Sequence, residues 1–382
     1  MSDKTSIRPA QEHDLQRLVE IENICFSSDI LSRRSFQRFL RNGAHELLVA
    51  ERKLDKQRQI VGYVLTLYRT GTSLARLYSI AVLPEHQGKG IARQLMLAAE
   101  KTALKQHCAY MRLEVNVNNA SAIHLYEKLG YLPMGRISNY YDDGGDALRM
   151  EKVVYAGSKR KKSAVPYYEQ TTDFTCGPAA LMMAMKTIEP SYQMSRREEL
   201  QIWREATTIF MTSGHGGCAP HGLALSAWQR QFKVELYINQ SGTPFIDSVR
   251  DPDKKAVMEL VHEDFVTRMQ DTDIGLHVQD ISPDTLKQLL HSGYAMIALI
   301  STFRFNRNKA PHWVFITSAD EHFIYINDPD ISEGPFQTET DYIQVPISIE
   351  EFINMACFGQ SRLRSLIVLT GPTVVRTRKS KN

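Results

Sequence analysis

The sequence predicts two domains: an α/β domain with a mixed sheet flanked by helices, followed by an α+β domain of helices and an antiparallel sheet. Three observations support this prediction. The length of 382 residues suggests two domains, at roughly 100–200 residues each. Helical and strand periods alternate through the first half, whereas the second half opens with a helix and closes with apolar strands. A small, basic segment ending at Pro166 separates the two halves.

The first predicted domain, residues 1–155, begins with a helix over 13–25, because apolar residues recur every three positions from Leu15 to Ile24. A strand over 77–83 is stopped by Pro84, and the helix over 120–130 is ended by its glycine. The remaining elements are strands 46–51 and 60–68, helix 91–106, strand 110–117 and a return to strand over 131–154. Together these elements predict a mixed sheet with helices on its faces.

The second predicted domain, residues 166–372, has a different order of elements. An extended segment over 167–175 leads into a helix that begins at Cys176. Residues 195–270 are predicted to be mostly helical and irregular. The helix over 282–293 has a Ser cap, a Pro in its first turn and a Gly past its end. Apolar strands are expected at 294–301, 313–317, 323–327 and 366–369.

Two basic runs carry the excess positive charge. They are the predicted linker, 156–165, which contains Lys159 to Lys162, and the predicted tail, 373–382. The net charge of the whole chain is only +3, so the remaining residues are mildly acidic. We interpret the runs as a solvated linker and a frayed tail. Contact with RNA or a ribosome stays as the alternative, although neither run interleaves aromatic residues that would stack on bases.

The composition excludes several classes of protein. With 43% hydrophobic and 23% charged residues, 21 Gly and 15 Pro, the chain is not collagen-like, of low complexity or mostly disordered. No apolar run approaches the ~18 residues that span a bilayer, and the polar N-terminus lacks the apolar core of a secretory signal. The five scattered cysteines form no CxxC pair and no zinc spacing, which indicates reduced thiols, a cytoplasmic protein and no metal site.

A glycine motif, Gln87-Gly88-Lys89-Gly90-Ile91-Ala92, lies between a predicted strand and a predicted helix. Glycines let the backbone approach a ligand, and the N–H groups at a helix start suit a pyrophosphate. The motif matches Q/R-x-x-G-x-G/A rather than the three-glycine dinucleotide fingerprint. In this setting it resembles the Gcn5-related N-acetyltransferases (GNAT). The resemblance implies acetyl-CoA as co-substrate, held by Ile80, Ala81, Val82, Gln87, Gly88, Lys89, Gly90, Ile91 and Ala92.

Downstream segments extend the resemblance over about the first 150 residues. Leu113-Glu114-Val115, Asn118 to Ala122 and Leu125 to Tyr131 resemble the ribosomal-protein-alanine acetyltransferase branch. That resemblance implies that Glu114 is the general base, Tyr126 the general acid and Asn119 a cofactor contact. The chemistry agrees, because an ammonium must lose a proton before it attacks a thioester and a leaving thiolate gains from a donor. Spacing alone would instead place Tyr126 in the core and let Glu114 face solvent. The acceptor is expected near residues 25–29 and Tyr140-Tyr141.

A second candidate site centres on Cys176, which opens a predicted helix in Gln170-Thr-Thr-Asp-Phe-Thr-Cys-Gly-Pro. The positive end of a helix dipole stabilises a thiolate, the nucleophilic form of cysteine. Gln170 lies six residues earlier, and we expect its side-chain amide to stabilise an oxyanion beside the Cys176 N–H. His312 opens one apolar strand and Asp328 closes the next, so antiparallel pairing would let Asp328 orient the imidazole that serves Cys176. Cys25, Cys108 and Cys357 are expected to be buried apolar residues.

Gln, Cys, His and Asp in this order resemble the bacteriocin-processing (double-glycine leader) cysteine peptidases of the papain-like clan. The likeness spans roughly residues 165–372 and lies in Q-x5-C-G-P, H-W-V and N-D-P. It implies a papain-like domain with Cys176, His312 and Asp328 as its triad and Gln170 at the oxyanion. The segment from Gly214 to His221, in the middle of this domain, matches no motif of these peptidases. The spacing of His215, Cys218 and His221 fits no zinc signature, so we expect a Gly-rich loop that shapes the substrate cleft.

The leading hypothesis is a bifunctional enzyme. One domain would acetylate an amine, such as a peptide or protein N-terminus, and the other would cleave a peptide-type amide. Three alternatives remain open. The second domain is a silent binding module, or an amidase or transferase for a small amide, or the chain is chiefly a ribosome-binding factor that acts through its basic segments.

Overall fold

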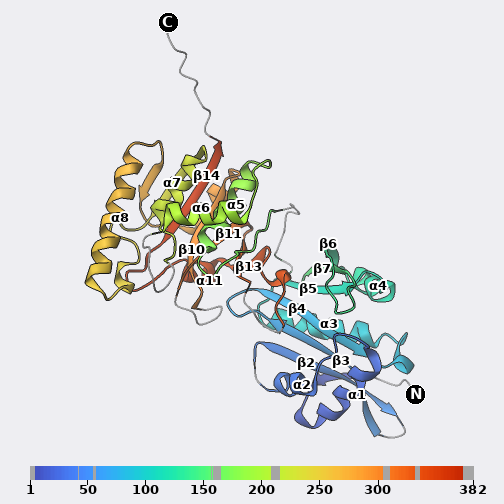
Figure 1. The fold of residues 1–382 in the computed structure, drawn as a ribbon. Helices are drawn as coiled ribbons and strands as arrows, with labels where there is room; N and C mark the ends of the chain where they lie inside the picture. The colour runs from blue at the N-terminus through green and yellow to red at the C-terminus, as the bar shows by residue number, and fades with distance from the viewer. Residues whose placement is uncertain are drawn as a thin grey trace. The chain divides into compact units, whose positions relative to one another are not determined.

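The computed structural model describes residues 5–41, 43–54, 57–155, 157, 165–207, 216–303, 310–331 and 336–372. The chain divides into two compact units, Met1–Ser158 and Lys159–Asn382 (Figure 1). The basic runs at 159–162 and 373–382 lie outside the described residues, so their roles stay predictions. Within the described ranges, no helix combines the length and the apolar character needed to cross a membrane.

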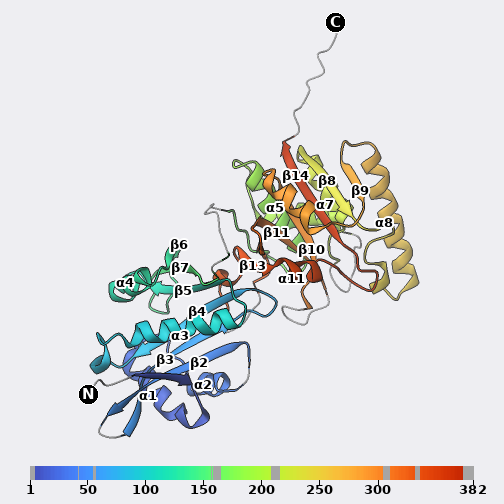
Figure 2. The ribbon, with the colours of Figure 1, turned by 180° about the vertical axis from the view of Figure 1, so that it is seen from behind.

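The first unit is built on a seven-stranded mixed sheet of order β1-β2-β3-β4-β5-β7-β6, which confirms the predicted α/β architecture. Helix α3 covers one face of this sheet, and α1 and α2 cover the other (Figure 2). Helix α2, which the sequence did not predict, packs Phe36 edge-on against Tyr63 of β3. The elements are β1 (Ser6–Pro9), α1 (Leu15–Cys25), α2 (Arg33–Phe39), β2 (His45–Leu54), β3 (Gln57–Tyr68), β4 (Leu74–Val82), α3 (Ile91–Lys105), β5 (Tyr110–Asn116), α4 (Ala120–Lys128), β6 (Leu132–Ile137) and β7 (Ala147–Val153).

Strands β4 and β5 form the parallel pair of this sheet, and their pairing ends early. The last paired residues are Leu77 and Leu113, although β4 continues to Val82 and β5 to Asn116. Beyond that point β4 stays paired with β3, and β5 stays paired with β7. The two halves of the sheet therefore separate, and one edge of β4 is left without a strand partner.

The second unit holds a seven-stranded sheet of order β13-β12-β11-β10-β14-β8-β9, antiparallel except between β8 and β9. This confirms the predicted α+β layout. Strand β8, however, falls within residues 195–270, which were predicted to be helical and irregular. The elements are α5 (Cys176–Ile188), α6 (Arg196–Ala206), α7 (Pro220–Gln229), β8 (Phe232–Ile238), α8 (Pro252–Gln270), β9 (Gly275–Val278), α9 (Pro283–His291), β10 (Ala295–Ser301), β11 (Pro311–Ala319), β12 (Phe323–Asn327), β13 (Val345–Ser348), α11 (Ile349–Met355) and β14 (Ser365–Pro372).

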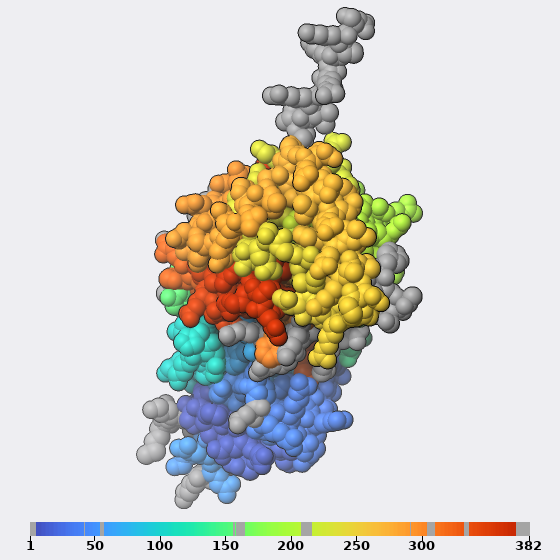
Figure 3. All heavy atoms as spheres, turned by 90° about the vertical axis from the view of Figure 1, so that its left-hand side faces the viewer, coloured from blue at the N-terminus to red at the C-terminus, as the bar shows by residue number. Residues whose placement is uncertain are grey.

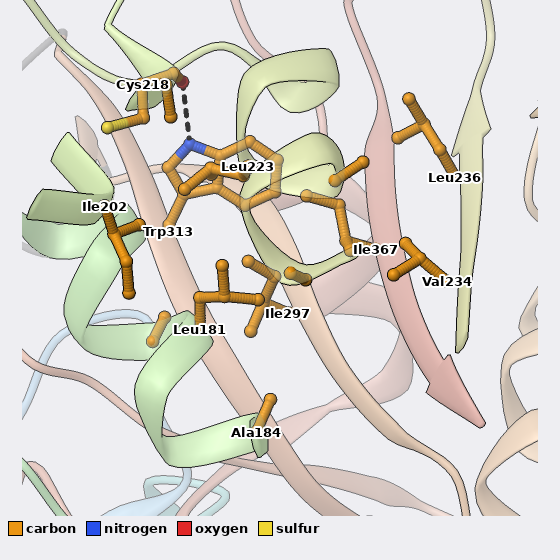
Figure 4. Close-up of a cluster of buried hydrophobic side chains, with 14 of the residues drawn as sticks. Leu181, Ala184, Ile202, Cys218, Leu223, Val234, Leu236, Ile297, Trp313 and Ile367 are labelled. Carbon is orange, nitrogen blue, oxygen red and sulfur yellow. Dashed lines mark hydrogen bonds between the residues drawn. The ribbon is translucent and has the colours of Figure 1, made fainter. Parts of the chain in front are cut away.

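The core of the second unit forms around α5, which is buried at every residue from Cys176 to Met185. A helix that is apolar all round needs neighbours on every side, and α5 packs against α6, α7, β10, β11 and β14. Trp313 lies among Leu181, Leu223 and Ile297, and its indole nitrogen donates to the Cys218 carbonyl at 3.2 Å (Figure 4). By contrast, α8, labelled in Figure 1, buries few side chains, and the yellow atoms of this part of the chain lie at the surface in Figure 3.

All five cysteines are free thiols. Cys108, Cys176 and Cys218 are buried, whereas Cys25 and Cys357 are half-buried. The expectation that Cys25 and Cys357 are fully buried was therefore wrong.

Helices α6 and α7 meet at Gly222, and we predict that Gly222→Ala destabilises the second unit. A Cβ at this position would lie 2.6 Å from the Ala206 Cα, which belongs to the main chain of α6 and cannot move aside as a flexible side chain could. Overpacking of this kind costs about 1–3 kcal/mol, which a chemical unfolding curve measures. The matched control is Gly242→Ala, because a Cβ there meets no atom within 4 Å. Equal unfolding midpoints for the two variants would contradict the tight contact.

Two candidate active sites

A cavity of about 350 Å³ opens where β4 and β5 separate. Residues of both strands line it, from Leu77 to Ile80 and from Glu114 to Asn116. Its lining also includes most of the segments that were expected near the acceptor: Phe26, Ser28, Asp29, Tyr140 and Tyr141. Four carboxylates face this space, those of Glu22, Asp29, Glu114 and Asp143. The cavity is therefore acidic and suited to a cation.

Glu114 does not face bulk solvent, because its side chain is only 4% exposed. Its Oε2 accepts a hydrogen bond from Arg76 Nε at 2.9 Å, and Arg76 Nη2 donates to the Tyr140 hydroxyl at 2.9 Å. The other oxygen, Oε1, is buried and has no hydrogen-bond partner among the described residues. Arg76 thus fixes the carboxylate and leaves one oxygen available. The sequence signal for Arg76 was a lone arginine inside the apolar strand from Leu74 to Val82.

Tyr126 both packs in the core and lines the cavity. Its ring lies 5.8 Å from that of Tyr131, and burial raises the pKa of Tyr126, so the phenol keeps its proton. Asn119 caps α4 by accepting the Ala122 N–H at 3.1 Å, and it also lines the cavity. The structure therefore brings Glu114, Tyr126 and Asn119 to one space, as their predicted roles require.

Glu22 is a cavity residue that the sequence analysis missed. It is 1% exposed and accepts hydrogen bonds from the Leu31 N–H at 2.7 Å and from the Tyr63 hydroxyl. Burial raises the pKa of Glu22, and the hydrogen bonds from Tyr63 and Leu31 oppose that rise. The available signal was helical spacing, because Glu22 follows the buried Leu18 by four residues and so lies on the inward face.

The glycine motif fits the pyrophosphate of acetyl-CoA. Gly88 and Gly90 have φ angles of 72° and 75°, and a Cβ at either position would meet no heavy atom within 4 Å. Gly90 precedes α3, and no side chain caps the first turn of that helix. Its N–H groups are thus available to an anion beside open space. Gln87 shapes the loop by donating from Nε2 to the Val82 carbonyl at 2.9 Å. Ile80 lines the cavity, and Ala81 and Val82 continue the unpaired edge of β4.

In the second unit, His312 and Asp328 lie at the ends of neighbouring strands, as predicted. His312 Nε2 is 2.7 Å from Asp328 Oδ1, and both side chains are under 10% exposed. Burial disfavours protonation of His312, but Asp328 and a hydrogen-bonding contact with Cys176 raise its pKa well above the usual value. Because Nε2 of His312 is hydrogen-bonded to Asp328, Nδ1 is the ring nitrogen available to interact with Cys176. The three predicted triad residues therefore come together.

The loop before Cys176 is tied to the segment that carries Asp328. The Gln170 N–H donates to the Pro329 carbonyl at 2.9 Å, and the Tyr167 hydroxyl donates to the Asp328 carbonyl at 3.0 Å. Gln170 Oε1 is buried without a hydrogen-bond partner among the described residues. Gln170 is thus placed near the triad, while its role at an oxyanion stays a prediction.

Comparison with known proteins assigns both units. Residues 15–131 match the acetyltransferase (GNAT) family, and residues 165–370 match the Peptidase_C39 like family. The chain is also 30% identical over 152 residues to a Bacillus subtilis protein named as a ribosomal protein bS18-alanine N-acetyltransferase, covering 39% of this chain and 96% of that one. The chain belongs to both families. We refer to its two parts as the GNAT domain and the C39-like domain.

Two further relatives match the GNAT domain. The catalytic subunit of the N-terminal acetyltransferase B complex of Arabidopsis thaliana is 28% identical over 165 residues, which cover 42% of this chain and 92% of that one. The crystal structure of the ribosomal-protein-S18-alanine N-acetyltransferase from Escherichia coli is 24% identical, with a TM-score of 0.36, and covers 42% of this chain and all of that one. GNAT enzymes use acetyl-CoA, so acetyl-CoA is the co-substrate of this domain.

The glycine-rich segment of the C39-like domain forms no metal centre in the part of the chain that is described. His215 lies outside the described residues. His221 instead packs edge-on against His262, with 4.7 Å between the ring centroids. Burial, together with a smaller effect of the neighbouring His262, lowers the pKa of His221 to about 4.

This buried histidine predicts a pH-dependent stability of the C39-like domain. The folded-state pKa of His221, about 4, lies below its unfolded value of about 6.5. The unfolded chain therefore binds more protons between these values, and the free energy of unfolding should fall as the pH drops from 6.5 to 4, by at most about 3 kcal/mol. Urea unfolding at both pH values measures this loss, and His221→Gln should reduce it. His322→Gln, at an exposed bend, is the control; an unchanged pH dependence in His221→Gln would contradict the assignment.

Proposed function

We propose that the GNAT domain acetylates the α-amine of a peptide or protein N-terminus, and that the C39-like domain hydrolyses a peptide-type amide. One observation supports each half. In the GNAT domain, Glu114 and Tyr126 line a single acidic cavity at the divergence of β4 and β5. In the C39-like domain, Cys176 contacts an imidazole that Asp328 orients.

Acetyl transfer begins with the acceptor, which is an ammonium at neutral pH and must lose a proton before it attacks. Glu114 Oε1 takes that proton, while Arg76 keeps the carboxylate in place. Acetyl-CoA supplies, when bound, an acetyl group activated as a thioester. As the carbon–sulfur bond breaks, the Tyr126 hydroxyl donates a proton to the departing sulfur. The first turn of α3 and the unpaired edge of β4 hold the pyrophosphate and the amide groups of the cofactor arm.

The cavity and the relatives support the proposed acceptor class. Four carboxylates and the rings of Tyr78, Tyr140 and Tyr141 surround the space, and both kinds of group attract an ammonium. The names of two of these relatives refer to an alanine of a ribosomal protein and to protein N-termini. An N-terminal α-amine combines that charge with a peptide chain that extends out of the cavity.

Amide hydrolysis uses Cys176 as nucleophile. The thiolate attacks the carbonyl carbon, and the Cys176 N–H with the Gln170 amide stabilises the oxygen that becomes negative. His312 then protonates the leaving amine, which breaks the carbon–nitrogen bond and leaves an acyl group on the sulfur. Water, deprotonated by His312, releases the acid and restores the thiol. Asp328 holds the imidazole through Nε2 in each step.

A second candidate role for the C39-like domain is substrate binding without cleavage. The observation in its favour is the burial of Cys176, which is only 8% exposed.

For acetyl transfer, we predict that Glu114→Gln lowers kcat by about 100-fold or more, because the acceptor then lacks its base. Tyr126→Phe should also lower kcat, since the departing sulfur loses its proton donor. Acetylation of N-terminal peptides by acetyl-CoA, followed by mass spectrometry, measures both effects. Glu127→Gln, on the exposed side of α4, is the matched control. Wild-type turnover in Glu114→Gln would refute the assigned base.

For hydrolysis, we predict that Cys176→Ser abolishes cleavage of a peptide library and leaves acetylation unchanged. His312→Ala should abolish cleavage as well, since no group then protonates the leaving amine. Truncated products are counted by mass spectrometry in the same samples. If the wild-type chain yields none, the binding role replaces the hydrolase.

A further inference from the structure

Glu199 of α6 is a buried carboxylate that the proposed chemistry does not use. Its exposure is 0%, and no described residue forms an ion pair with it. A buried charge is costly unless hydrogen bonds compensate for the lost water. Glu199 accepts four of them, all from the loop that leads to Cys176: from the Thr171 N–H at 2.8 Å, the Thr171 hydroxyl at 2.7 Å, the Tyr168 hydroxyl at 3.0 Å and the Thr175 hydroxyl.

The bond from Thr175 changes how α5 begins. Thr175 is the residue before this helix, where a threonine hydroxyl ordinarily accepts an N–H of the first turn. Here its side chain caps no such group, because the hydroxyl is turned toward Glu199, to which it donates its single proton, and lies 3.0 Å from the Thr172 carbonyl oxygen. The third residue of the helix, Pro178, has no N–H to offer. The N–H groups of Cys176 and Gly177 are thereby kept clear of a side-chain cap.

We propose that Glu199 is a positioning residue for Cys176. By holding Thr171 and Thr175 it fixes the loop from Gln170 to Cys176 and keeps the Thr175 hydroxyl away from the first turn of α5. The positive helix end then acts on the thiolate and on the oxyanion rather than on a cap. This inference rests on the proposed nucleophilic role of Cys176.

The test is alkylation of Cys176 by iodoacetamide in the full chain, followed by mass spectrometry of the Cys176 peptide, over about pH 5 to 9, where thiols and imidazoles titrate. Glu199→Gln leaves buried donors without an acceptor and frees Thr175 to cap Gly177. We expect its labelling at neutral pH to slow by about tenfold or more and its pH profile to move upward. A role limited to charge predicts the opposite, since removing a negative charge favours a nearby thiolate.

Glu198→Gln is the matched control, because this neighbouring glutamate bonds Tyr192 and Arg230 instead of the loop. It should label at the wild-type rate. If Glu199→Gln does not fold, Thr171→Val, which removes one hydroxyl at an exposed residue, decides the question and should slow labelling several-fold. Labelling of a folded Glu199→Gln, or of Thr171→Val in its place, at or above the wild-type rate overturns the inference. Failure of wild-type Cys176 to react would instead remove the proposed hydrolase and this inference together.

Discussion

The hydrogen bond between His312 and Asp328, 2.7 Å long and closed to solvent, is the interaction on which the C39-like site depends. A buried imidazole would ordinarily lose its proton, because burial disfavours charge. The Asp328 carboxylate reverses that preference and also fixes which ring nitrogen faces Cys176. The neighbouring loop helps to hold this pair in position, because Tyr167 and Gln170 both donate hydrogen bonds to main-chain carbonyls of the Asp328-Pro329 segment.

The GNAT site also contains a buried charged group, and a residue of another type compensates for its burial. Its buried carboxylate, Glu114, is compensated by Arg76, which bridges β4, β5 and Tyr140 just where the strands begin to separate. Arg76 therefore links the two strands of the parallel pair and orients Glu114, the proposed base. In both sites a charged residue remains buried because its interaction with one defined partner offsets the free energy of desolvation.

Much of this organisation was readable from the sequence. Periodicity predicted the strands from β2 to β5 and from β10 to β12, because each carries a run of apolar residues with a clear end. The motifs singled out Glu114, Tyr126, Cys176, His312 and Asp328, which lie in the two candidate sites. Strand β8 was missed inside a polar region, although Phe232, Val234, Leu236 and Ile238 alternate strictly. Arg76, Glu22 and Glu199 were missed for a different reason: buried charges look like surface residues until tertiary partners are known.

The early end of pairing between β4 and β5 has a consequence for how the GNAT domain tolerates change. The peptide groups on the unpaired edge of β4 belong to the main chain, so they are present whichever side chains the strand carries, provided that the strand itself folds. The same cavity is also lined by carboxylates and phenols, among them Asp29, Asp143, Tyr140 and Tyr141, whose chemistry a substitution alters. Substitutions in the cavity lining can thus change the selectivity for the proposed acceptor while they leave the main-chain groups of β4 intact.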